Sequence, residues 1–336
     1  MNDGADRTPS PRADVCIVGA GPAGATIAAE LSAAGYGVVV LDAGPRFDPV
    51  DRVEQMERHL RPGVDGTVWD TDPERDAYSS SGERYYPLNV ARVKGIGGST
   101  LHWQAMVMRM HEQDFELASA TGMADDWPLD YEDLRPYYAD AEEELSVSGA
   151  SDNPFAPPRD QPHPLPAFPP SYSDSLFADA CEAVGLTTHS VPNARNSEST
   201  NEASACVGYG TCNPVCPSGA KYDATRHIDA AEATGARVVD RAPVQRLEHD
   251  AAGDRVTAAV YATPDGSKHR QAARALLVAV CGVRMPRAAG VSGNQRSRVG
   301  HCTSGVRAAP EVPGHERAGI GGTPHGPERP DHVGFI

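Results

Sequence analysis

Three glycines near the N-terminus, Gly19, Gly21 and Gly24, are spaced as G-x-G-x-x-G between an apolar run and an alanine-rich stretch. In a strand–turn–helix unit, the first glycine permits a tight turn, the second lets backbone approach a pyrophosphate, and the third lets helix and strand pack closely. The helix N-terminus favours the anion through its free N–H groups and its dipole. Asp42 follows the next apolar run and predicts hydrogen bonds to an unphosphorylated ribose, which favours FAD or NAD over NADP. The alternative is a glycine-rich turn that binds no ligand.

A second glycine cluster lies in residues 91–108, ARVKGIGGSTLHWQAMVM. Through this segment and the later run WPLDYEDLRPYYADAEEELSVSG, the sequence resembles the glucose-methanol-choline (GMC) family of flavoprotein oxidoreductases. The resemblance covers residues 13–281 and is closest to the gluconate and sugar dehydrogenase catalytic subunits. It implies FAD as the cofactor.

The resemblance also implies roles for the residues of this second cluster. The backbone of Gly97 and Gly98 would lie against the flavin ring, and Ser99 and Thr100 would donate hydrogen bonds to it. His102 stands where some family members bond the flavin covalently through a histidine, whereas others with a similar His-Trp pair hold FAD without that bond. The alternative is a packed His-Trp pair near the cofactor that takes no part in the chemistry.

Three cysteines, Cys206, Cys212 and Cys216, form the pattern C-x5-C-x3-C-P. Compared with the ferredoxin run C-x2-C-x2-C-x3-C-P, Tyr209 replaces the second cysteine. Closely spaced thiolates broken by glycines suit iron–sulfur ligation, and three ligands favour a [3Fe-4S] cluster. Some of the multi-subunit dehydrogenases that the chain resembles carry such a site, which implies these three cysteines as its ligands. The alternatives are inert or disulfide-bonded cysteines, or a zinc site with His227 as the fourth ligand.

The elements that must position these residues indicate an α/β fold. The expected architecture is a Rossmann-like FAD-binding domain of the GMC type with a partial α+β substrate domain and an irregular C-terminal tail. Uniformly apolar strands at 14–18 and 38–41, joined by a helix, are typical of a buried parallel sheet. The predicted FAD-binding domain is discontinuous, and excursions and the partial substrate domain with the cysteine cluster interrupt it. The domain is expected over 13–45, 90–110 and 235–281, and the interruptions over 46–89 and 125–234.

Charge and hydropathy exclude several classes of function. The formal charge of −16 argues against nucleic-acid binding, which needs a basic face. No apolar run approaches the roughly 18 residues of a membrane span, and the polar N-terminus shows no signal peptide, which predicts a cytoplasmic protein. Only three of the 30 basic residues are lysines, which is compatible with a halophile-like, salt-adapted protein or with GC-rich coding and ordinary acidity.

The last segment, residues 282–336, differs from the rest of the chain. It carries seven arginines against four acids, is rich in glycine and proline, and shows neither a helical nor a strand period. We expect it to be disordered or out-of-frame, and the chain to be a truncated or frameshifted relative of the family. The catalytic base therefore stays unassigned, because none of its histidines has an informative context: His301, His315, His325 and His332.

The resemblance implies oxidation of a CH–OH group in a sugar, sugar acid or polyol. A base would take the hydroxyl proton while hydride passes to the flavin. Electrons would leave through the iron–sulfur cluster to an external acceptor, with a small subunit and a cytochrome as implied partners. The alternative is a catalytically inactive FAD-binding remnant. An NAD-dependent dehydrogenase is a weaker hypothesis, because it leaves the second glycine cluster and the cysteines unexplained.

Overall fold

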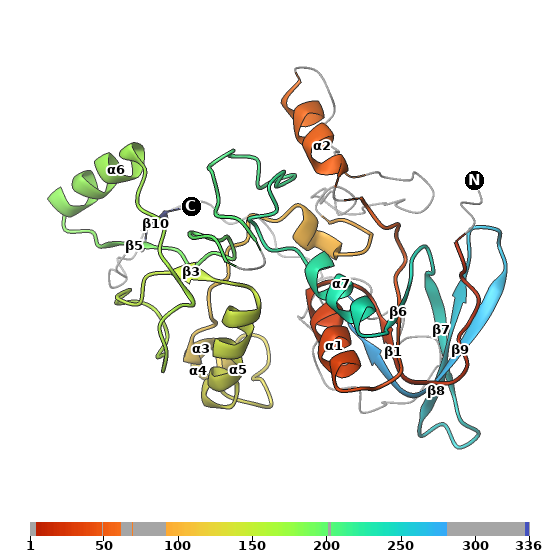
Figure 1. Ribbon diagram of the computed structural model, residues 1–336. Coiled ribbons are helices and arrows are strands. Elements are labelled where there is room, and N and C mark those ends of the chain that lie inside the picture. The colour runs from red at the N-terminus through yellow and green to blue at the C-terminus, as the bar shows by residue number, and fades with distance from the viewer. Residues whose placement is uncertain are drawn as a thin grey trace, which may run out of the picture. The chain divides into compact units, whose positions relative to one another are not determined.

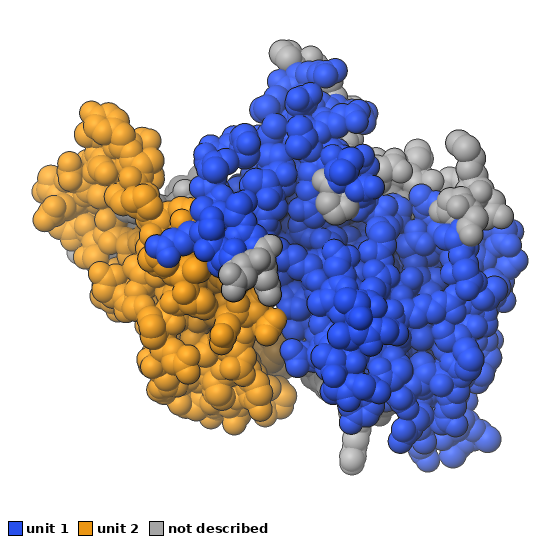
Figure 2. Space-filling view, viewed as in Figure 1, with its two compact units in different colours: residues 1–105, 198–303 blue, residues 106–197, 304–336 orange. Residues whose placement is uncertain are grey.

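A computed structural model of the chain describes residues 5–48, 50–61, 69, 92–200 and 203–280, together with the backbone of 333–335. The chain divides into two compact units. Unit 1 comprises residues 1–105 and 198–303, and unit 2 comprises 106–197 and 304–336 (Figure 2). The expectations for most of 46–89 and for the 282–336 tail fall outside the described residues, apart from one short strand in the tail.

Unit 1 is built on one six-stranded sheet with the order β6–β2–β1–β9–β8–β7 (Figure 1). Strands β6, β2, β1 and β9 are parallel, and β8 and β7 continue the sheet antiparallel from β9. The expected α/β class with a mainly parallel sheet is confirmed. The strands are β1 (Ala13–Val18), β2 (Val38–Leu41), β6 (Arg237–Val239), β7 (Val244–His249), β8 (Val256–Ala262) and β9 (Lys268–Val278).

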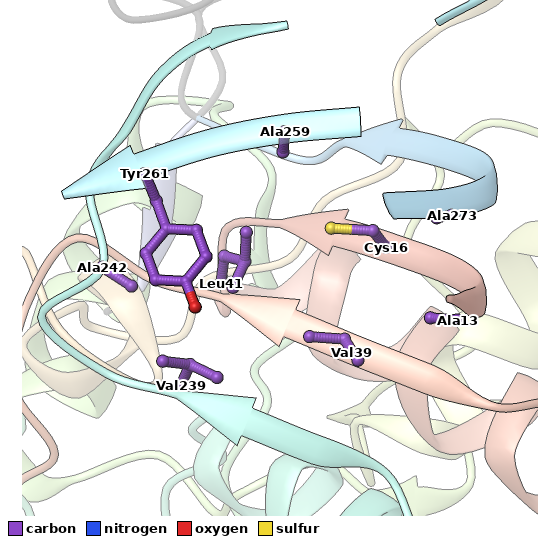
Figure 3. Packing of buried hydrophobic residues seen from close by; sticks show 9 residues of the cluster. All are labelled: Ala13, Cys16, Val39, Leu41, Val239, Ala242, Ala259, Tyr261 and Ala273. Atoms are coloured by element: carbon purple, nitrogen blue, oxygen red, sulfur yellow. The ribbon is translucent and has the colours of Figure 1, made fainter. Parts of the chain in front are cut away.

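The centre of this sheet is buried on both faces, as its apolar strands predict. Cys16 pairs with Val39 and Leu276, while Ile17 pairs with Val40 and Leu277, so neighbouring strands present matching faces. One face forms a hydrophobic cluster that β8 also enters (Figure 3). Its buried members are Ala13, Cys16, Val39, Leu41, Val239, Ala242, Ala259, Tyr261 and Ala273.

Two helices of unit 1, α1 (Pro22–Ala33) and α7 (Thr225–Ala233), lie side by side (Figure 1). Their C-terminal ends are joined by a hydrogen bond of 2.7 Å between the hydroxyls of Ser32 and Thr234. Helix α7 is the crossover that leads into β6, so residues 198–234 belong to unit 1. This segment lies within 125–234, the range expected for excursions and the partial substrate domain. The assignment of a cofactor domain to the discontinuous ranges stays a prediction.

Unit 2 contains short helices and short strand pairs. The acidic run within residues 126–145 forms α5, which begins after an Asp130 N-cap that accepts the Asp133 N–H. Strand β3 pairs with β4, and β5 pairs with β10, the one part of the tail whose backbone is described. The elements are α3 (Glu112–Phe115), α4 (Leu117–Thr121), α5 (Tyr131–Glu144), β3 (Ser148–Gly149), β4 (Leu165–Pro166), α6 (Tyr172–Ala183), β5 (Thr188–Ser190) and β10 (Val333–Phe335).

The interior of unit 2 holds a group of charged side chains around Glu142 on α5. Arg109 donates to both carboxylate oxygens of Glu142, from Nε at 2.7 Å and from a terminal nitrogen at 2.9 Å. Arg159 donates to the same carboxylate at 2.6 Å and to Nε2 of His163 at 2.8 Å. Burial opposes ionisation of Glu142, but the Arg109 hydrogen bonds and the charges of Arg109 and Arg159 together outweigh it and lower the pKa of the carboxyl below its ordinary value. We call these four residues the Glu142 cluster.

Two further elements complete the described parts of unit 1: helix α2 (Asp51–Leu60) and the single 3-10 turn η1 (Gly98–Leu101). The α2 residue Arg52 forms an ion pair of 2.9 Å with Asp223, which lies just before α7. Across the described ranges, no helix is long and apolar enough to cross a membrane.

Candidate functional site

The first glycine motif lies in the turn between β1 and α1, and two of its glycines are required by close backbone packing. Gly19 has a φ of +103°, and a β-carbon there would lie 2.6 Å from the carbonyl oxygen of Ala279. A β-carbon on Gly24 would lie 2.0 Å from the carbonyl oxygen of Gly19. Both positions therefore exclude any side chain, as the motif predicts.

Gly21 differs, because a β-carbon there would meet nothing within 4 Å. Its φ of −77° is also accessible to other residues. The protein packing does not require a glycine at this position. The motif assigns to its second glycine the role of leaving space for a ligand beside the backbone, and this role would require a glycine here.

The N-terminus of α1 suits an anion. Gly21 is its N-cap, no side chain caps the helix, and its first turn contains no acidic residue. Pro22 occupies the first helical position, where its missing N–H costs nothing. The helix has 12 residues, and its dipole adds a partial positive charge to the first-turn N–H groups that no side chain caps.

Asp42 follows β2 directly and is 9% exposed. Its carboxylate oxygens accept the Ala20 N–H at 2.9 Å and the Gly44 N–H at 2.8 Å. The residue therefore holds the glycine turn as well as standing at the position expected for a ribose ligand.

The second glycine cluster packs directly on the first. The N–H of Gly97 donates to the carbonyl of Ala20 at 2.9 Å. A β-carbon on Gly98 would lie 3.1 Å from the Cα of Gly21. The structure thus brings together two motifs that lie far apart in the sequence, and it does so through backbone contacts that glycine permits.

The polar residues after Gly98 have different environments. The Thr100 hydroxyl donates to the Gly97 carbonyl at 2.5 Å and accepts the Ala224 N–H at 2.9 Å. Its proton is therefore used in a hydrogen bond within the protein in this structure. Ser99 is exposed, and its hydroxyl accepts the Val93 N–H at 3.3 Å. His102 ends η1 and is partly exposed.

A residue that the sequence analysis did not single out lies beside this turn. Lys221 is 1% exposed, and its ammonium donates to the carbonyls of Leu101, Trp103 and Cys212 at 2.9, 2.9 and 2.8 Å. Burial lowers its pKa to about 8, partly offset by the Cys216 thiol. The signal in the sequence was a lysine in a chain that has only three, placed among alanine and tyrosine.

No disulfide joins the three cysteines of the predicted cluster to one another or to another described cysteine. Cys216 is buried, while Cys206 and Cys212 are partly exposed. Among the residues that the structure describes, no three cysteine, histidine or acidic side chains are arranged to hold a metal ion. His227, the fourth ligand considered for zinc, hydrogen-bonds the Tyr222 hydroxyl at 2.8 Å, and ligation of a metal group by the three cysteines stays a prediction. We derive no step through a metal group.

Two further cysteines, Cys16 on β1 and Cys181 on α6, are buried. Burial raises the pKa of the Cys16 thiol to about 12.

Comparisons with known proteins agree with this geometry. The fructose dehydrogenase large subunit of Gluconobacter japonicus is 33% identical over 308 residues, covering 87% of this chain and 56% of that protein. The 2-methyl-1,2-propanediol dehydrogenase of Mycolicibacterium austroafricanum is 27% identical, covering 85% and 51%. The chain thus spans about half the length of these curated relatives.

A solved structure shares the fold. It is an FAD-dependent oxidoreductase from Chaetomium thermophilum, which covers 84% of this chain with a TM-score of 0.51 and 15% identity, while the match spans 48% of that chain. The family model for GMC oxidoreductases matches residues 16–304, which is most of the sequence. The protein therefore belongs to the GMC oxidoreductase family.

Proposed function

We propose that unit 1 binds FAD and that the protein is, or forms part of, a dehydrogenase of alcohols. One observation carries the proposal: the second glycine cluster contacts the first, through the Gly97–Ala20 hydrogen bond and the approach of Gly98 to Gly21. A simple dinucleotide-binding turn does not need this second layer of backbone. An extended cofactor, with a pyrophosphate on α1 and a ring system beyond it, needs this second layer of backbone.

The residues present supply binding and orientation. The first turn of α1 would bind the pyrophosphate, and Asp42 would accept hydrogen bonds from the ribose. Gly97 and Gly98 would let the flavin approach the backbone, with Ser99, Thr100 and His102 beside it. When bound, FAD supplies a hydride acceptor for the oxidation of a CH–OH group. The residue that takes the hydroxyl proton is not assigned, because the four tail histidines lie outside the described residues.

The relatives point to the substrate class. The two curated relatives reported above are named for fructose and for a diol, so we propose a sugar, sugar acid or polyol as the donor. Because the chain spans about half of these relatives, activity and substrate are proposals for the protein as a whole. The second candidate is a catalytically inactive FAD-binding protein.

Cofactor binding is tested by titrating the apoprotein with FAD and with NAD and following the flavin fluorescence and protein melting. We expect saturable FAD binding, with NAD at least tenfold weaker. Gly21→Val should weaken FAD binding about tenfold or more without lowering the melting temperature, because its side chain would occupy ligand space. The matched control, Ala33→Val at the exposed end of α1, should leave binding unchanged. Equal binding by both variants would contradict the assignment.

Activity separates the two candidates. The FAD-loaded protein is mixed with fructose, gluconate or a diol and an artificial electron-acceptor dye under anaerobic conditions. Reduction of the dye by any of these donors supports a dehydrogenase. Tight FAD binding with no turnover of any donor supports the inactive binding protein.

A separate proposal concerns the cysteines. We propose, from their spacing and the resemblance alone, that Cys206, Cys212 and Cys216 ligate a [3Fe-4S] cluster and that a small subunit and a cytochrome or other acceptor receive the electrons. The name of the fructose relative describes a large subunit, which supports a multi-subunit protein. Iron and labile-sulfide analysis of anaerobically purified protein tests the cluster. Three irons per chain, lost in Cys216→Ser, would support it, whereas bound zinc or no metal would exclude it.

A further inference from the structure

The ammonium of Lys221 uses all of its hydrogen-bonding capacity inside the protein. An ammonium has three donors and no acceptor, and each donor of Lys221 binds one main-chain carbonyl. While these bonds stand, the group has no free donor for a substrate and no lone pair for a proton. Its role is therefore to hold backbone in place.

The bonded carbonyls belong to two segments that sequence reasoning links to cofactors. Leu101 and Trp103 flank His102, so Lys221 fixes the peptide group that precedes this histidine and the one that follows Trp103. The third carbonyl belongs to Cys212, in the cysteine segment. One side chain thus ties the turn beside the predicted flavin site to a second predicted site.

The residues after Lys221 contact the same turn. The Tyr222 carbonyl accepts the indole N–H of Trp103 at 2.9 Å, and the two rings pack edge to face with centroids 6.2 Å apart. The Ala224 N–H donates to the Thr100 hydroxyl at 2.9 Å. Four hydrogen bonds therefore join residues 221–224 to residues 100–103.

We infer that Lys221 is a positioning residue that holds the His102 turn in the conformation needed to receive the flavin. The inference deepens the proposed function and rests on it for the identity of the ligand. Loss of the ammonium would leave three carbonyls without their donor, and the bond to Leu101 is fully buried. The turn would move to find other donors, and the site would be ordered only part of the time.

The test compares Lys221→Met with Arg109→Met in the full chain. Methionine keeps an unbranched side chain of similar length and removes the donors. Arg109 is the matched control, because it is also a buried cation but belongs to the Glu142 cluster of unit 2. Two measurements are made: hydrogen exchange of the apoprotein, and the dissociation constant for FAD together with the absorbance spectrum of the bound flavin.

In Lys221→Met we expect faster exchange at the Gly97, His102 and Trp103 amides, which the structure shows hydrogen-bonded, while β1 and β2 keep their protection. We expect the FAD dissociation constant to rise about tenfold and the flavin bands to shift. Arg109→Met should change none of these. Unchanged protection of the 97–103 amides in Lys221→Met would overturn the inference, and so would an equal loss across β1 and β2.

A variant that retains donors covers the case in which Lys221→Met does not fold. Lys221→Gln keeps an amide with two donors, and selective loss of protection at 97–103, smaller than a complete loss, would support the inference. Failure of this variant to fold, or uniform loss of protection, would overturn it. If the wild-type chain binds no FAD, the proposed function fails, and the exchange of the apoprotein still decides whether Lys221 positions the turn.

Discussion

Apolar side chains, most of them small, pack against the sheet of unit 1, whereas unit 2 keeps a carboxylate, two guanidinium groups and an imidazole in its interior. In unit 1 the close contacts are between backbones, such as that of Gly24 with Gly19. In unit 2 the contacts are between charged side chains from distant segments. Packing in unit 1 thus depends on glycines that carry no side chain, whereas packing in unit 2 depends on matched charges.

The difference has an energetic consequence. Extra volume is the main threat to a sheet whose strands and helix meet through glycine, because overpacking displaces backbone. An unmatched charge is the main threat to the Glu142 cluster, because a buried ion without its partner keeps the desolvation cost. The two units should therefore fail under different substitutions, and four experiments sharpen this comparison.

The largest expected effect is that of Glu142→Gln. The change removes the charge that two guanidinium groups share, and we expect unit 2 to lose about 4 kcal/mol of unfolding free energy. Denaturant-dependent hydrogen exchange of α5 measures it. The control is Glu143→Gln, on the exposed neighbouring residue, which should change stability by less than about 0.5 kcal/mol. Equal effects would mean that the cluster contributes nothing specific.

In unit 1 the corresponding change is Gly24→Ala. A single methyl would collide with the Gly19 carbonyl, and we expect a loss of about 3 kcal/mol, measured by exchange of the β1 amides. Gly21→Ala adds the same methyl three residues earlier, where nothing lies within 4 Å, and should leave the sheet intact. If both alanines are tolerated alike, backbone packing does not explain the motif.

The pH dependence of unit 2 should be smaller but clear. Burial, with the Arg159 charge, lowers the pKa of His163 to about 4, against about 6.5 for an unfolded histidine. Between these two pH values the imidazole of His163 is protonated in the unfolded state but not in the folded state. Stability therefore falls as the pH drops from about 6.5 to about 4. From pH 7 to pH 5 we expect a loss of about 2 kcal/mol.

The control for this pH effect is His163→Gln, measured by denaturant titration of both proteins at each pH. The difference between wild type and variant isolates the imidazole from other groups that titrate in this range. A difference that does not change with pH would show that folding leaves the pKa of His163 at its unfolded value.

The smallest effect is expected for an ion pair of the same type in solvent. Arg274 bonds Asp14 at 3.0 Å across the edge of β9 and β1, but its side chain is 68% exposed. Arg274→Ala should change unfolding free energy by about 0.5 kcal/mol or less, and added salt should reduce even that. A loss similar to that of Glu142→Gln would remove burial as the reason for the difference between the units.

Sequence reasoning located the parts of the site that rest on local rules. The glycine spacing between an apolar strand and an alanine-rich helix predicted the β1–α1–β2 unit, and Asp42 was found from its distance to the motif. The contact between Gly97 and Ala20 was not predicted, because nothing local to either segment indicates that they meet; the resemblance only assigned both glycine clusters to one cofactor.

Other features could not be predicted because they depend on partners far along the chain. Lys221 looked like an ordinary lysine, since its three acceptors are main-chain carbonyls that leave no trace in side-chain types. The four residues of the Glu142 cluster lie at separate positions in the sequence, and each of them taken alone looks like a solvent-exposed polar residue. Helix α7 was missed because its nine residues are too few for a convincing period.

Strand β9 has a consequence for how the protein is made. It supplies the neighbour of β1 on the side opposite β2, pairing Ala13 with Ala273. During synthesis β1 is made long before β9, and its apolar edge stays unpaired on that side until β9 has been made. Such an edge is a template for other strands, so nascent chains that stall before β9 should aggregate or require a chaperone. Correct folding of unit 1 therefore depends on translation continuing through β9.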